Sequence, residues 1–285
     1  MSFLTAPFFL LFACDMGPSA DTVVDELRVL ATLAEPPEAL PGEAVALETL
    51  IVSPDGASYD VLMWTCTFTG EACLEASGST AWDGMVLVEG ATEQWQSSTV
   101  TVSSALGYVA SAEPIPLVQH WALACEPGLC PVIDAAAADP AQGSDGATRL
   151  QELLSSPTDF LADLPMGGAS LGLRTLSVST RGVDERLQNP TVDCAVRQGF
   201  SSSTEVEGVV PYQCTVDGEL SDVASAWGYA TDGGWGGANV PLFAGDTEFD
   251  YDWFAPEESA EVDAWVIVTD GVGGVGIFET GMEVR

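Results

Sequence analysis

Lysine is absent from this chain of 285 residues, whose basic side chains are seven arginines and one histidine. Against them stand 43 carboxylates, which give a formal net charge of −36. A surface of this sign repels a phosphate backbone, so the composition argues against nucleic-acid binding. With one histidine and no paired CxxC motif, the chain also lacks the ligand pattern of a zinc site.

The chain also has no apolar run long enough to span a bilayer, for which about 20 residues are needed. Its N-terminal apolar stretch covers residues 3–13, a length that suits a secretory signal. Residues 11–14, Leu-Phe-Ala-Cys, resemble a bacterial lipobox, although Phe12 is bulky and no basic residue precedes the stretch. The resemblance implies a lipoprotein signal peptide over 1–13, a lipidated Cys14 and a tether over 14–25. An ordinary cleaved signal or a misplaced start codon is the alternative.

The seven cysteines support export, because removing a lipidated Cys14 leaves an even set of six. An even set in an exported chain favours disulfides. Proximity and domain membership suggest the pairs Cys194–Cys214, Cys66–Cys73 and Cys125–Cys130. Two other pairings stay open among the four N-terminal cysteines.

Apolar residues make up 47% of the chain, enough for a globular protein despite the charge. Short β-rich runs separated by proline and glycine turns predict a first sandwich over residues 26–135. These runs are 26–34, 43–52, 58–66, 81–88, 95–103 and 116–125.

A small, acidic segment follows and predicts a linker with short helices over residues 136–168. Leu150, Leu153 and Leu154 share one helical face, and Ser156-Pro157 is typical of the start of a second helix. These helices are interpreted as a plug at the domain junction, with a hinge or lid as the alternative. Further strand-like runs predict a second sandwich over residues 169–285.

Three glycines near the end, Gly271, Gly273 and Gly276, have the spacing G-x-G-x-x-G. A dinucleotide site would need a helix after them, but only nine alternating residues remain. The pattern therefore predicts a glycine-rich turn between the last two strands.

Two blocks of sequence carry a resemblance to a known kind of protein. They are ELRVLATLAEPPEALPGEAVALETLIVSPDG with MWTC, within residues 26–66, and AWGYATDGGW, DWFAP and AWVIVTDGVGGVG, within residues 226–285. The first block resembles the first domain of lipoproteins from Gram-negative bacteria whose modules are immunoglobulin-like or PKD-like. The second block is similar to the closing strands of a PKD-like domain, in which Trp and Tyr fill the sandwich and the last turn is glycine-rich. The resemblance implies an all-β fold of two immunoglobulin-like β-sandwich domains with a short helical segment at their junction. It implies no activity.

Catalytic candidates are few. GASLG at 168–172 matches the nucleophile-elbow pattern with Ser170 as nucleophile, but a strand-like run follows and the only histidine, His120, precedes it. A serine hydrolase using Ser170 is therefore a minor alternative. His120 is interpreted as a strand residue near a disulfide.

Two weak binding candidates lie in the second sandwich. Alternation in residues 246–253 places Asp246, Glu248, Asp250 and Asp252 on one strand face, opposite Phe249, Tyr251 and Trp253. The four carboxylates suit calcium chemically, yet a flat strand keeps them apart, so a solvated face is the alternative. Trp235, in a glycine-rich loop, could stack on a glycan or peptide or pack into the core.

The sequence thus predicts a lipid-anchored protein of the cell envelope, facing the periplasm or cell surface, with a non-catalytic binding or structural role. A calcium-stabilised adhesion or glycan-binding module is the alternative. The expected partners are the membrane, through the lipid, and an envelope protein or glycan. No cofactor is expected beyond calcium.

Overall fold

The computed structural model describes residues 22–67, 81–88, 93–108, 110–127, 129, 168–237 and 239–285; for 66–67, 81–88 and 108 this covers the backbone alone. Cys14, Cys73, Cys130 and the helices predicted between residues 148 and 164 lie outside these ranges. The described chain is β-sheet with two short 3-10 helices, η1 (Ser104–Tyr108) and η3 (Val183–Glu185). None of the helices in these ranges is long and apolar enough to cross a membrane.

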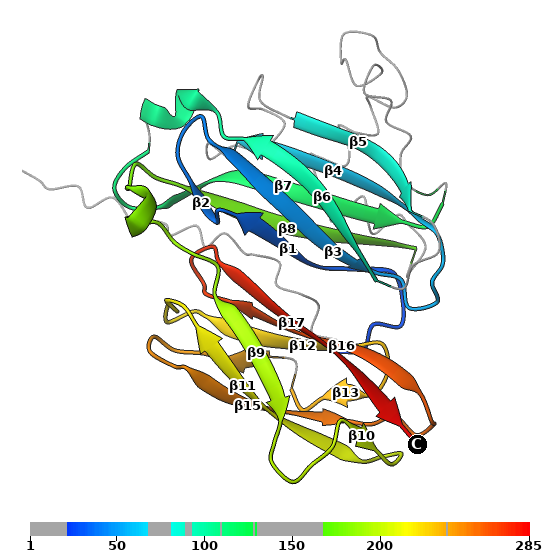
Figure 1. The fold of residues 1–285 in the computed structure, drawn as a ribbon. Helices are drawn as coiled ribbons and strands as arrows, with labels where there is room; N and C mark the ends of the chain where they lie inside the picture. Colours follow the sequence, from blue (N-terminus) through cyan, green and yellow to red (C-terminus); the bar gives the residue numbers. More distant parts are fainter. Residues whose placement is uncertain are drawn as a thin grey trace, which may run out of the picture.

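The N-terminal half forms two facing sheets, seen in the upper part of Figure 1. One has the order β1-β3-β6, with β1 (Arg28–Glu35), β3 (Ala44–Val52) and β6 (Glu93–Thr101). The other has the order β2-β8-β7-β4-β5, with β2 (Glu38–Ala39), β8 (Ala169–Val178), β7 (Ile115–Cys125), β4 (Tyr59–Thr67) and β5 (Ala81–Val88). We call this pair the first sandwich.

The C-terminal half repeats this arrangement as the second sandwich. One sheet has the order β13-β15-β11-β9, with β13 (Gly234–Trp235), β15 (Glu248–Phe254), β11 (Val209–Asp217) and β9 (Thr191–Val196). The other has the order β10-β17-β16-β12-β14, with β10 (Ser203–Thr204), β17 (Val275–Val284), β16 (Glu261–Thr269), β12 (Ser225–Ala230) and β14 (Asn239–Pro241).

Strand order identifies both halves as immunoglobulin-like. In the second sandwich, β9, β11, β15 and β13 take the places of strands A, B, E and D, and β12, β16 and β17 those of C, F and G. In the first, β1, β3 and β6 match A, B and E, and β4, β7 and β8 match C, F and G. Each half also has a short strand parallel to the G strand, β2 on β8 and β10 on β17.

One predicted boundary is wrong. The second domain was expected to begin at residue 169, but β8 pairs antiparallel with β7 from Ala169 to Val178 and completes the first sandwich. Residues 126–168 therefore join strands F and G of one sandwich instead of linking two domains. The true connection between the sandwiches is the segment 179–190.

Alternating burial builds each core. In β15 the residues alternate between buried aromatic side chains and exposed carboxylates up to Trp253, as the period of two predicts. Phe249, Tyr251 and Trp253 join the large apolar cluster that fills the second sandwich. The first sandwich contains two smaller clusters, one around Leu47 and Leu176 and one around Ile51 and Tyr59.

Candidate interface at the junction of the two sandwiches

A separate apolar cluster lies between the sandwiches and holds them against each other. From the first sandwich come the buried side chains of Leu30, Leu50 and Val52, and from the second those of Tyr229, Trp265, Ile267 and Val275, with Val24 from the incoming chain. Figure 1 shows β1 and β3 next to the layer formed by β17, β16 and β12. The outer face of the β12-β16-β17 sheet is thus covered by the first sandwich.

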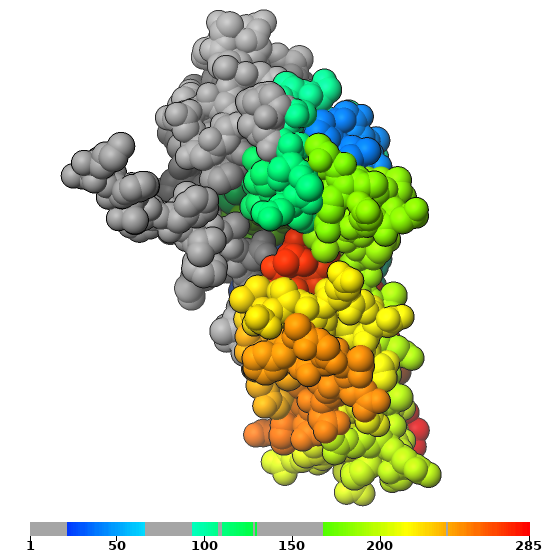
Figure 2. Space-filling model, turned by 90° about the vertical axis from the view of Figure 1, so that its left-hand side faces the viewer, coloured from blue at the N-terminus to red at the C-terminus, as the bar shows by residue number. Residues whose placement is uncertain are grey.

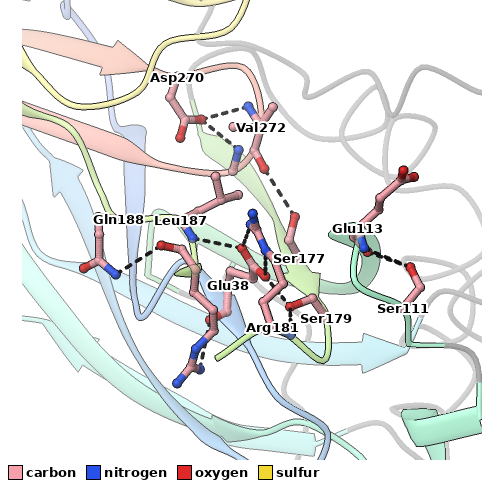
Figure 3. A network of polar contacts seen from close by, with 12 residues as sticks. Glu38, Ser111, Glu113, Ser177, Ser179, Arg181, Leu187, Gln188, Asp270 and Val272 are labelled. Carbon is pink, nitrogen blue, oxygen red and sulfur yellow. Dashed lines mark hydrogen bonds and ion pairs between the residues drawn. The ribbon is translucent and has the colours of Figure 1, made fainter. Parts of the chain in front are cut away.

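The connecting segment is fixed by Glu38, a carboxylate with no exposed surface. Arg181 pairs with both carboxylate oxygens, its Nε donating to Oε1 at 2.9 Å. The hydroxyl of Ser179 donates to the same carboxylate, and the Leu187 amide donates to Oε2 at 2.9 Å (Figure 3). Burial alone would raise the pKa of Glu38, but the hydrogen bonds from Arg181, Leu187 and Ser179 outweigh it and lower the pKa.

Arg186 adds a second tie between the connecting segment and the first sandwich. Its buried guanidinium pairs with Glu43 and donates to the Glu38 carbonyl at 3.3 Å. Glu43 in turn accepts a hydrogen bond from the Leu40 amide at 2.7 Å. Residues 179–187 are therefore held along β2 and the start of β3 by ion pairs, an arrangement that opposes bending between the sandwiches. We call the set Glu38, Glu43, Ser179, Arg181 and Arg186 the linker clamp.

Asn189 bridges the two sandwiches directly. Its amide nitrogen donates to the Ala34 carbonyl of β1 at 2.8 Å, and its amide oxygen accepts from the Val275 N–H of β17 at 3.0 Å. Both bonds use backbone groups of the strands, so the side chain joins β1 of the first sandwich to β17 of the second.

The glycine-rich turn between β16 and β17 is also part of the junction. Asp270 Oδ1 accepts the N–H groups of Val272, Gly273 and Gly274 at 2.7–2.8 Å. Gly273 has φ +127°, which L side chains rarely adopt. The Val272 carbonyl accepts a hydrogen bond from Ser177 of β8 at 3.2 Å, so the turn docks on the first sandwich. The predicted turn is confirmed.

Asp270 itself is buried, and burial raises its pKa, while the three N–H bonds and the charge of Arg174 act in the opposite direction. Arg174 belongs to β8, so this electrostatic interaction also crosses the junction. A buried carboxylate near a buried guanidinium is stabilised only while both are present.

Two carboxylates, Glu93 of the first sandwich and Glu279 of the second, lie near each other at the junction. The Trp265 indole of the second sandwich donates to Glu93 Oε2 of β6 at 3.0 Å. Burial raises the pKa of Glu93, and the nearby negative charges of Glu279 and Asp263 raise it further. Negative charge from both halves therefore meets here.

Beside this pair runs an open groove of about 580 Å³ between the sandwiches. It is lined by Leu33 and Trp95 of the first sandwich, residues 189–192, and residues 275–279 of β17. In Figure 2, a segment close to the C-terminus, in red, lies between the upper part of the molecule and the yellow and orange lower part.

The structure does not form the nucleophile elbow that the GASLG pattern around Ser170 would require. This serine lies inside β8 opposite Ala124, and its hydroxyl accepts the Val29 N–H at 2.9 Å. His120 lies opposite Arg174, four residues along the strand from Ser170, and is fully buried with Nδ1 3.0 Å from Thr65 Oγ1. The interpretation of His120 as a strand residue is confirmed.

The four carboxylates considered for calcium do not converge. Glu248, Asp250 and Asp252 are exposed along β15, Asp250 pairs with Arg197, and Asp246 accepts the Phe243 N–H at 2.8 Å in a turn. Across the described ranges, three or more His, Cys, Asp or Glu side chains nowhere form a group that could hold a metal ion.

Trp235 is buried, with 5% of its surface exposed, so the loop exposure that a stacking role requires is absent. Its ring lies 4.7 Å from that of Tyr251, and its indole donates to the Tyr229 carbonyl at 2.9 Å. The alternative of core packing is therefore correct. An added Cβ at Gly228 would lie 2.4 Å from this indole, which explains the glycine there.

Of the predicted disulfides, Cys194–Cys214 is confirmed. It joins directly opposed residues of β9 and β11 within one sheet, whereas the disulfide of antibody domains joins the two sheets. Cys125 is also disulfide-bonded. The pairings proposed for Cys66, Cys73 and Cys130 fall outside the described side chains.

Sequence reasoning did not find the linker clamp, Asn189 or the role of Asp270 at the junction. One signal was present: three of the seven arginines, Arg174, Arg181 and Arg186, fall within thirteen residues. In a chain so poor in cations, such a concentration indicates carboxylates that need a partner.

The fold and junction thus define an all-β protein of immunoglobulin-like sandwiches. Neither a protein-family model nor a curated protein sequence matches the chain. Among solved structures, the D00-D0 domain of intimin is 9% identical with a TM-score of 0.27, over 91% of this chain and 98% of that one. Red sea bream transglutaminase is 10% identical with a TM-score of 0.27, over 92% of this chain. Native E. coli alpha-2-macroglobulin is 9% identical with a TM-score of 0.26, over 90% of this chain.

The chain spans 32% of the transglutaminase and 17% of the alpha-2-macroglobulin chain. TM-scores this low establish no shared fold, so the assignment to the immunoglobulin-like class depends on strand order alone.

Proposed function

We propose that this protein is a non-catalytic, lipid-anchored component of the cell envelope, in which two immunoglobulin-like domains act as one rigid spacer and docking unit. The observation that carries the proposal is the linker clamp. A flexible tandem would need a connection free to bend, whereas Glu38 is buried and bound by three groups of the connecting segment. The apolar cluster between the sandwiches opposes separation in the same way.

The path of the incoming chain supports anchoring at the junction. Residues 22–24 run along β12, where Val24 N–H donates to the Ala230 carbonyl at 2.8 Å and Ala230 N–H donates to the Thr22 carbonyl at 2.9 Å. At about 3.5 Å per extended residue, the eight peptide units from Cys14 to Thr22 span no more than about 30 Å. A lipid on Cys14 would therefore hold the junction close to the membrane.

The anchor is tested by intact-mass analysis of the membrane fraction from the native host, before and after reduction with thiol alkylation. The expected result is a diacyl or triacyl chain that begins at Cys14, with six cysteines alkylated only after reduction. An unlipidated chain with free thiols would overturn both the anchor and the envelope location.

Rigidity is tested separately with paired spin labels, one on each sandwich, at exposed positions Ser97 and Thr215. A rigid unit predicts one narrow distance distribution, and Glu38→Gln is expected to broaden it. A broad distribution in the unmodified protein would overturn the spacer.

The absence of catalysis is tested at Ser170, the one nucleophile that the sequence singles out. We expect no labelling by a serine-reactive probe, because the hydroxyl is bonded to Val29 inside a sheet. Labelling that Ser170→Ala removes would favour the hydrolase alternative.

A further inference from the structure

The two edges of the β10-β17-β16-β12-β14 sheet are protected unequally. At the β14 edge, Leu242 N–H donates to the Ala224 carbonyl, so the nitrogen of Pro241 points away from β12. A proline at this position blocks strand addition. At the opposite edge, β10 covers β17 only at Glu283 and Val284.

The rest of the β17 edge has free backbone groups. Asp270 N–H donates to the Gly274 carbonyl and Val284 N–H to the Ala260 carbonyl, so even-numbered residues of β17 bond to β16. The odd-numbered residues face outward, where Val275 N–H is taken by Asn189 and Glu283 N–H by Ser202. Between them, the N–H and C=O groups of Ile277 and Glu279 and the N–H of Gly281 form no backbone hydrogen bond with another described residue.

Space is available along this free stretch. The groove between the sandwiches is lined by Ile277, Phe278 and Glu279, and a Cβ added at Gly281 would meet nothing within 4 Å. A strand placed there would have Leu33 and Trp95 on one side and Pro190 and Val192 on the other. The apolar side chains of Pro190 and Val192 suit the apolar face of such a strand, while its other face would lie on the side of Leu33, Trp95 and Glu279.

The negative charge beside the groove favours a positively charged occupant. Glu279 lies in the groove, and Glu93 faces it across the junction. Arg285, at the end of β17, and Arg197, after β9, are already paired with Glu283 and Asp250. The indole of Trp265 is the hydrogen-bond donor to Glu93, and it carries no formal charge.

We propose that the edge of β17 from Ile277 to Gly281 binds an extended, basic segment of a partner protein as an added strand. The outward N–H and C=O groups supply the ladder, Pro190 and Val192 contact its apolar residues, and Glu279 and Glu93, on the opposite side, pair with its cations. A second copy of this chain fits less well, since two such edges would oppose Glu279 to Glu279 in molecules that each carry −36 charges. This inference rests on the proposed docking role.

The test uses the full chain and a short fluorescent peptide of alternating arginine and valine, with a glutamate–valine peptide as the control. We expect the arginine peptide to bind at least about tenfold more tightly, and more weakly as salt rises. Amide hydrogen exchange at Ile277, Glu279 and Gly281 should slow on binding, while exchange at Val240 of the proline-blocked edge stays unchanged.

Three variants separate the contribution of backbone hydrogen bonds to binding from that of charge. Glu279→Pro removes an outward N–H without touching the bonds to β16, so binding should be lost while the melting temperature is nearly kept. Glu279→Gln should weaken binding severalfold and reduce its salt dependence. Glu283→Gln, at the covered end of the edge, should bind like the wild type.

Equal binding of both peptides, or unchanged exchange at Ile277 and Glu279 when the arginine peptide is bound, would overturn the proposal without any variant. Protection of these amides that grows with protein concentration in the absence of peptide would assign the edge to a second copy instead. Neither outcome affects the spin-label distances, so the rigid spacer stands or falls separately.

Discussion

His120 shows what one buried titratable residue does to the stability of the first sandwich. It lies between the two apolar clusters of that sandwich, in a layer with the buried side chains of Thr32, Thr49, Thr65 and Arg174. Burial lowers its pKa from 6.5 to about 4. The unfolded chain therefore takes up a proton first as the pH falls.

We predict that the free energy of unfolding decreases between pH 6.5 and pH 4 because of His120, by about 3 kcal/mol when complete. Urea denaturation across this range measures it, and His120→Gln should lack this part of the pH dependence. The raised pKa values of Glu93 and Asp270 act in the opposite direction, since they favour the folded state at lower pH, but both are present in wild type and variant. Parallel pH profiles of the two proteins would contradict the prediction.

Two arginine–glutamate ion pairs, one at Glu38 and one at Glu283, can be compared because they lie in different surroundings. Glu38 is buried against a partly exposed Arg181, whereas Glu283 and Arg285 are both exposed. We predict that Glu38→Gln lowers the free energy of unfolding at neutral pH by about 3 kcal/mol, because Arg181 loses its counter-charge. Glu283→Gln should leave the urea midpoint unchanged. The lowered pKa of Glu38 means that its contribution is present above its unfolded pKa and lost in acid. Equal midpoints for both variants at neutral pH would contradict this.

At the scale of strands, the side chain of Asn189 directly connects one strand of each sandwich. Asn189 satisfies an outward N–H of β17 and a carbonyl of β1. We predict that Asn189→Ala costs about 1–3 kcal/mol of unfolding free energy, because it leaves both backbone groups without that partner. Faster amide exchange at Val275 is the local readout, with Gln188→Ala as the control. Unchanged exchange at Val275 would show that water replaces the side chain at no cost.

The strands were predictable from the sequence, but their partners were not. Alternation located β15 and both of its faces, because burial of every second residue depends only on local spacing. It could not assign β8, whose partner β7 is separated from it by residues 126–168. The sequence did contain a signal for the junction: AWVIV at 264–268 is buried without alternation, as expected of a strand covered on both faces. The linker clamp depends on contacts between residues about 140 positions apart, which spacing cannot reveal.

At the scale of the whole molecule, unpaired negative charge is the dominant feature. Within the described residues, five arginines form ion pairs with carboxylates, and the whole chain has only seven arginines against 43 acidic side chains. Mutual repulsion destabilises the folded state, and salt screens it over roughly 10 Å at moderate ionic strength. Sodium chloride should therefore raise the melting temperature.

Calcium distinguishes this general screening from a specific site. Since Asp250 is paired with Arg197 and the β15 carboxylates stand apart, we predict that calcium chloride raises the melting temperature no more than sodium chloride at equal ionic strength. An ion that bound only the folded state would instead raise the melting temperature further, in a saturable way and at low concentration. Such an increase, removed by Asp252→Asn but kept in Asp193→Asn on the edge strand β9, would establish a calcium site on β15. Its absence would favour the other interpretation of the β15 carboxylates, a solvated strand face.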